Sequence, residues 1–137
     1  MSEAVEWTER GRLARRDGDD QEALRCYQQA AMLYEAVDDR TGLAHTLRHC
    51  SELQAKLGDG AGALESIARA YEIYEANEPA PLEMANTFRI GALAHEAARE
   101  PWKAEREWLN ALQLYTEIGV QAGVDEATAR LKRLGVG

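Results

Sequence analysis

A-L-R-C-Y-Q-Q-A-A-M-L-Y, at residues 23–34, returns in altered form as A-L-E-S-I-A-R-A-Y-E-I-Y at residues 63–74 and A-E-R-E-W-L-N-A-L-Q-L-Y at residues 104–115. Each copy begins with Ala, has a large apolar residue four positions later, Ala after seven positions and Tyr after eleven. These offsets place all four side chains on one stripe of an α-helix. The copies start 40 and then 41 residues apart, and a period in that range indicates an array of helical hairpins.

Glycine and proline predict where the helices end. Gly18, Gly58 and Gly119 stand between helical patterns, as do the only three prolines, and no stretch alternates like a strand. We predict an all-α fold with helices near residues 3–17, 20–37, 41–57, 60–77, 80–98, 101–118 and 122–134. Three hairpins (3–37, 41–77 and 80–118) would be followed by a single helix (122–134) that covers the open apolar end of the array. All 137 residues are expected to form one domain.

The composition restricts the classes of function. A formal net charge of -8 argues against binding to nucleic acids or to anionic membrane surfaces, both of which need a basic face. No apolar run is long enough for a membrane helix, and the N-terminal residues lack the pattern of a signal peptide. Cys26 and Cys50 are the only cysteines, and we interpret them as two buried thiols of a cytoplasmic protein.

The repeat resembles the tetratricopeptide repeat family at its signature spacings. The first copy carries the motif at Trp7, Gly11, Ala14, Gly18-Asp19, Ala23, Tyr27 and Ala30. The second keeps Leu47, Gly58-Asp59, Ala63, Ile67 and Ala70, and the third keeps Phe88, Ala104, Trp108 and Ala111. Arg99-Glu100-Pro101 replaces the Gly-Asp turn in the third copy, and the period is longer than the family's usual one, as in members found in bacterial signalling and transcription regulators.

The resemblance implies a right-handed superhelix whose first helices line a concave peptide-binding groove. The positions that would face this groove are Thr8, Glu9, Arg12, His45, Arg48, His49, Glu52, Asn86, Arg89, Ile90 and Leu93. The clamp that chaperone-tail-binding members use on a terminal carboxylate is absent, so a different peptide is implied. Arg12, Arg48, Arg89 and Asn86 would hold acidic or backbone groups of the peptide, while Ile90 and Leu93 would form an apolar subsite.

The leading hypothesis is a non-enzymatic module, without metal or cofactor, that binds a peptide segment of a partner protein. Two alternatives remain open: a self-associating structural protein, and a small acidic chaperone for a secreted client. The chain would be a monomer or a homodimer. Trp102, outside the repeat pattern, is interpreted as a local packing residue or as an exposed anchor for a partner.

Two motifs suggest other chemistry. Residues 58–63 match a dinucleotide-binding G-x-G-x-x-A string, but the segment before them is helical where that fingerprint needs a strand. His45, His49 and Glu52 share one helix face and, with Glu9, could form a metal site. We favour a polar groove surface instead. The common sequence motifs of nucleophilic and metal-dependent enzymes are absent.

Overall fold

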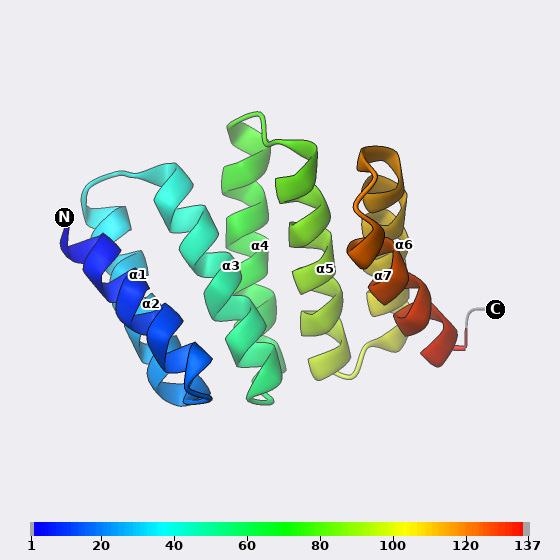
Figure 1. Ribbon diagram of the computed structural model, residues 1–137, viewed down its shortest axis with the longest axis horizontal. Helices are drawn as coiled ribbons and strands as arrows, with labels where there is room; N and C mark the ends of the chain where they lie inside the picture. The colour runs from blue at the N-terminus through cyan, green and yellow to red at the C-terminus, as the bar shows by residue number, and fades with distance from the viewer. Residues whose placement is uncertain (1, 136–137) are drawn as a thin grey trace.

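Helices form all the regular structure of the described chain. The computed structural model describes residues 2–135, which contain seven α-helices and no strand (Figure 1). The helices are α1 (Glu3–Arg16), α2 (Asp20–Ala36), α3 (Arg40–Lys56), α4 (Gly60–Ala76), α5 (Pro81–Ala97), α6 (Pro101–Ile118) and α7 (Gln121–Arg133). None of these helices is long and apolar enough to cross a membrane. The all-α prediction is confirmed, and each helix end lies within one residue of its predicted position.

Aspartates spaced 20 residues apart start three successive helices. The side chains of Asp19, Asp39 and Asp59 accept hydrogen bonds from backbone N–H groups three residues later, at 3.1, 2.9 and 2.9 Å. Each satisfies an N–H group that the first helical turn leaves unpaired. Before the last of them, Gly58 has a φ of +86°, in the left-handed region that glycine adopts without steric cost. The recurring Gly-Asp motif is therefore a turn followed by a helix cap.

The turn into α6 uses different residues for the same backbone path. Arg99 has a φ of +62°, although a residue with a Cβ atom rarely adopts this conformation. Glu100 precedes the helix without a side-chain capping hydrogen bond, and Pro101 occupies the first turn, where its missing N–H has no intrahelical role. The third hairpin thus keeps the geometry of the first two without their Gly-Asp residues.

The helices form two layers. Each packs against the next in sequence, and α3 also packs against α5. In Figure 1, α1, α3, α5 and α7 form the layer nearer the viewer, with α1 and α7 at opposite ends of the row. We call the surface formed by these four helices the groove face.

The repeated stripe forms the core between the layers. Its first alanines (Ala23, Ala63 and Ala104) and second alanines (Ala30, Ala70 and Ala111) are all 0% exposed. The large apolar residues Tyr27, Ile67 and Trp108 are buried with them, as are Tyr74 and Tyr115, while Tyr34 is half-buried. The alanines allow close helix packing, and the larger residues fill the space beside them. The prediction that this stripe packs the hairpins is confirmed.

Both cysteines belong to the core. Cys26 and Cys50 are free and are 2% and 3% exposed. Burial raises the pKa of Cys50 to about 12, and burial followed by the nearby Glu22 carboxylate raises the pKa of Cys26. Both thiols are therefore protonated at neutral pH and are poor nucleophiles.

Candidate functional site

A row of ion pairs crosses the groove face. Arg15 of α1 donates to Glu52 of α3 at 2.8 Å, and Arg89 of α5 donates to the other oxygen of Glu52 at 3.2 Å. Arg89 also donates through Nε to Glu126 of α7 at 2.5 Å. Each partner lies 37 residues from the previous one along the chain (52 − 15, 89 − 52 and 126 − 89). Residues that face each other on neighbouring helices of this face are therefore 37 positions apart in the sequence, a spacing that we call the 37-residue register.

These pairs shift the proton affinities of their members. Burial alone would raise the pKa of Glu52, but the hydrogen bond and charge of Arg15, together with Arg89, bring it below its ordinary value. Burial would likewise lower the pKa of Arg89, yet Glu126 and Glu52 raise it. Both side chains are therefore ionised at neutral pH. The predicted site residue Arg89 is already paired with two carboxylates, so it is not an open anion-binding group.

His45 and His49 bind tyrosines of the adjoining helices. His49 stacks on Tyr27 with ring centroids 4.9 Å apart, and its Nδ1 lies 3.5 Å from Nη1 of Arg15. His45 hydrogen-bonds Tyr74 through Nδ1 and faces Glu83 at 3.4 Å through Nε2. Within residues 2–135, no group of three or more His, Cys, Asp or Glu side chains is placed to hold a metal ion. The structure assigns these imidazoles to packing and hydrogen bonding instead.

The remaining predicted positions differ in exposure. Ile90 is 3% exposed and belongs to the core, which corrects its assignment to an apolar subsite on the surface. Leu93 is half-buried and lines a hollow of about 480 Å³ on the groove face. Asn86 accepts a hydrogen bond from the Tyr115 hydroxyl at 2.5 Å, and Thr8 donates to the Ala4 carbonyl at 2.9 Å. Only Leu93 therefore remains a candidate for apolar ligand contact.

Arg12 and Glu9 form an exposed pair at the α1 edge of the face. Their closest atoms are 2.5 Å apart, and the two side chains are 57% and 50% exposed. An exposed pair between neighbours on one helix contributes little to stability and is readily exchanged for another partner. Arg12 thus remains accessible to a ligand, although it is not unpaired.

Arg48 has no such partner. Its side chain makes no hydrogen bond or ion pair with residues 2–135, and its Nη1 is buried without an acceptor. The guanidinium lies 5.8 Å from the centre of the Tyr74 ring. In the 37-residue register, the facing positions are Gly11 on α1 and Ala85 on α5, neither of which carries a polar side chain. Arg48 and Arg89 occupy the same repeat position, yet only Arg89 is neutralised.

A family model described as tetratricopeptide repeat matches residues 3–76, which begin with α1 and end with α4. The chain belongs to the tetratricopeptide repeat family. This helical repeat is a non-enzymatic fold of protein–protein interaction. No curated protein matches the chain.

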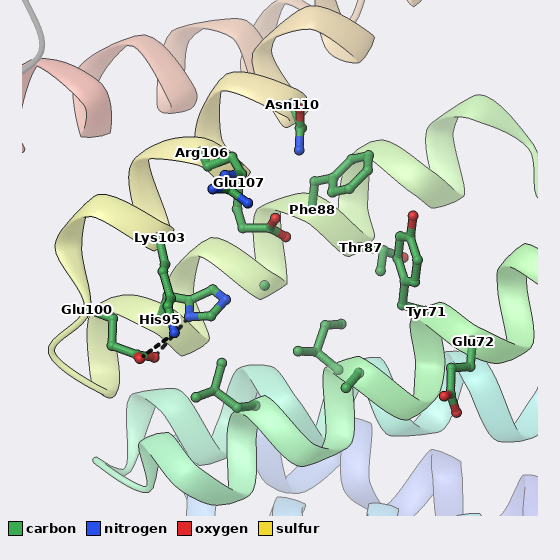
Figure 2. Close-up of a pocket in the computed structure, with 14 residues that line it drawn as sticks. Tyr71, Glu72, Thr87, Phe88, His95, Glu100, Lys103, Arg106, Glu107 and Asn110 are labelled. Atoms are coloured by element: carbon green, nitrogen blue, oxygen red, sulfur yellow. Dashed lines mark hydrogen bonds and ion pairs between the residues drawn. The ribbon is translucent and has the colours of Figure 1, made fainter.

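The sequence predicts a groove on the layer formed by α1, α3, α5 and α7, and the structure also has a hollow on the layer that contains α4 and α6. It has a volume of about 790 Å³ and lies between α4 and α6, with α5 at its base (Figure 2). The sequence patterns did not predict this site. A comparison of equivalent repeat positions could have found it, because Glu107 replaces the small Ser66 of the preceding hairpin.

Proposed function

We propose that this protein binds a peptide segment of a partner protein on the groove face, and that Arg48 receives a carboxylate of that peptide. The proposal rests on the unpaired state of Arg48 within the described chain. A buried guanidinium N–H without an acceptor costs on the order of 1–3 kcal/mol. A ligand carboxylate that pairs with this group recovers much of that cost, so the face favours an acidic peptide even though the chain carries a net charge of -8.

The other charges of the groove face support this assignment by their pairing. Arg15 and Arg89 are bound to Glu52 and Glu126, which makes them poor sites for an added anion. Arg12 lies on the neighbouring helix and exchanges its exposed partner easily. Arg48 would thus fix one acidic residue of the peptide, Arg12 a second, and Leu93 an apolar side chain.

We further propose that α5 and α6 form a third repeat of the same kind and that α7 caps it. Trp108 and Tyr115 of α6 occupy the places that Ile67 and Tyr74 occupy in α4. From α7, Ala127 and Leu131 join the same buried cluster as Trp108. The binding face would then extend over three hairpins, and the chain would act as one domain.

A peptide screen followed by a double-mutant cycle tests the groove proposal. Random 12-residue peptides displayed on phage are selected on the wild-type protein, and the selected peptides are labelled for fluorescence polarisation. Each acidic residue of a binding peptide is then changed to its amide and measured against wild type and Arg48→Met. Arg25→Met is the matched control, because Arg25 lies on α2 and its one ion pair among residues 2–135 is with Glu22 of its own helix.

We expect Arg48→Met to weaken binding by about 2 kcal/mol, as for a truncated interfacial charge pair. One acidic residue of the peptide should show a coupling energy of at least about 1 kcal/mol with Arg48, whereas Arg25→Met should leave affinity unchanged. Peptides whose affinity does not depend on Arg48, or a lack of coupling with every acidic residue, would show that this residue is not the anchor.

A further inference from the structure

The hollow between α4 and α6 exists because the residue at its base differs from the residue at the equivalent position of the preceding hairpin. Cys50 of α3 is buried at the position equivalent to Gly91 of α5, 41 residues later. In the earlier hairpin, the side chains of Ser66 on α4 and Gln54 on α3 also hydrogen-bond each other, at 2.7 Å. Gly91 has no side chain to fill the equivalent space, so the base of the hollow is bare backbone at this position.

Glu107 occupies that space. A Cβ atom on Gly91 would lie 2.7 Å from Oε2 of Glu107, so the absence of a side chain there admits the carboxylate. Figure 2 shows the Glu107 carboxylate directed into the cavity from α6. The side chain is half-buried and makes no hydrogen bond or ion pair within the described range 2–135. Burial raises the pKa of Glu107, which His95 and Arg106 only partly oppose. The carboxylate is thus partly desolvated without a bound counter-charge.

The cations around Glu107 are engaged elsewhere or lie at the rim. Lys103 donates to Glu100 at 3.1 Å, and the His95 ring contacts the other oxygen of the same carboxylate at 3.1 Å. Arg106 is exposed and forms no ion pair among the residues that the structure describes. Of the acids that line the cavity, Glu100 is therefore neutralised, and Glu72 is exposed at the edge. An anion would meet Glu107 in the middle of the cavity, whereas a cation would supply its missing partner.

Aromatic and apolar side chains line the rest of the cavity. The rings of Tyr71 on α4 and Phe88 on α5 lie with their centroids 6.0 Å apart at 50°. Ile67 and Leu64 of α4 extend this apolar wall. Aromatic faces attract organic cations through the ring quadrupole and also pack against an alkyl chain. A long chain with a charged end matches both parts of the cavity.

Trp102 extends this surface beyond the cavity. It is 63% exposed and lines a neighbouring hollow of about 190 Å³ that shares Glu107 and Lys103 with the first. A basic side chain would bring a peptide backbone with it, and that backbone would lie at the rim.

We propose that the cavity between α4, α5 and α6 is a second binding site, separate from the groove face, for an alkylammonium or guanidinium group that pairs with Glu107. The group enters as a lysine or arginine side chain of a peptide or as a free aliphatic amine. The charge is bound at the bare backbone of Gly91, and the alkyl chain lies against Tyr71 and Phe88.

NMR titration of the whole chain tests this site with defined probes. ¹⁵N-labelled protein is titrated with spermidine, with N-acetyl-lysine methylamide and N-acetyl-arginine methylamide, and with N-acetyl-glutamate methylamide as the anionic control. We expect saturable amide shifts at Gly91, Phe88 and Glu107 with at least one cation and none with the glutamate derivative. The cation that saturates at the lowest concentration identifies a free amine or a peptide side chain as the source.

Matched variants assign the effect to the carboxylate. Glu107→Gln keeps the shape of the side chain and should weaken binding of that cation at least about tenfold, the loss expected for a hydrogen bond to a charged group. Glu65→Gln removes the same charge from an exposed position of α4 outside the cavity and should change the dissociation constant less than twofold. Circular dichroism confirms that both variants keep their helices.

Three results would overturn the proposal. One is that no cation gives saturable shifts at these amides up to 20 mM. The second is that Glu107→Gln binds as tightly as wild type, and the third is that Glu65→Gln weakens binding as much as Glu107→Gln does. The last result would mean that the probes respond to the net charge of the protein and not to a site. None of these results depends on Arg48, so failure here leaves the groove proposal standing.

Discussion

The imidazole of His49 is held neutral inside the fold, and this should make the protein less stable in mild acid. Burial lowers the pKa of His49 from 6.5 to about 4, and the positive charges of Arg48 and Arg15 add to the effect. The 3.5 Å approach of Arg15 Nη1 to Nδ1 agrees with this state, because arginine can only donate and the ring nitrogen must therefore accept. Glu52 opposes the shift, and His45 adds slightly to it.

The sign and size follow from the difference between the folded and unfolded chains. Between pH 6.5 and pH 4 the unfolded chain binds a proton at His49 that the folded chain does not, so stability falls as the pH falls through this window. At pH 5.5, one unit below the unfolded value, the loss would be tenfold in the folding equilibrium, or about 1.4 kcal/mol. Because the ring is partly exposed, we expect about 1 kcal/mol after solvent screening.

Urea denaturation of wild type and His49→Gln at pH 7.5 and pH 5.5 isolates this contribution. Other titrating groups, including Glu52 and Glu107, are common to both proteins and cancel in the comparison. At pH 7.5 the variant should be less stable by about 1 kcal/mol, because the stacking on Tyr27 is lost. At pH 5.5 the two should be nearly equal. If the stability difference is the same at both pH values, folding does not lower the pKa of His49, and the conclusion that its ring is held neutral by burial is wrong.

Three further variants test the packing that positions the site. Glu52→Gln removes the acceptor shared by Arg15 and Arg89 and should lower the free energy of unfolding by about 2 kcal/mol in urea denaturation, less than for a fully buried pair because all three side chains are partly exposed. Gly123→Ala places a Cβ atom against the Tyr115 ring and should cost about 2 kcal/mol in the same assay. Deletion of residues 121–137 uncovers the cluster around Trp108, so it should lower the melting temperature or cause association in light scattering. A truncated monomer with unchanged melting would contradict the capping role of α7.

The fold could be predicted because its information is local and repeated. The spacing of Ala, the large apolar residue, Ala and Tyr within one helix is sufficient to define the buried stripe, and the same stripe occurs three times. Asp19, Asp39 and Asp59 mark helix starts through contacts within three residues. The turn at Arg99 differs in sequence from the other two turns, yet the helices on both sides of it begin and end within one residue of their predicted positions.

The site was less predictable because pairing depends on residues of neighbouring helices. Arg48 and Arg89 are equivalent in the repeat, and no local sequence pattern distinguishes them. The structure separates them through the 37-residue register, which places Glu52 and Glu126 beside Arg89 but Gly11 and Ala85 beside Arg48. That register comes from the relative positions of whole helices, and no local pattern contains it. Ile90 was misplaced for a related reason, because its burial depends on the packing of α5 against α3 and α4, whose residues form the core cluster that contains it.

Both proposed sites arise where a repeated position loses a partner. Arg48 lacks the carboxylates that neutralise Arg89, and Glu107, which has no hydrogen bond among residues 2–135, replaces Ser66, which is hydrogen-bonded to Gln54. A repeat protein must keep its apolar stripe in every copy, since each hairpin buries the next. Its polar positions are under no such constraint, so charges can differ between copies at little cost to the fold. A charged side chain that lacks a partner in one copy of the repeat can therefore determine which ligand the protein selects. Here one such charge is cationic on the groove face, and the other is anionic between α4 and α6.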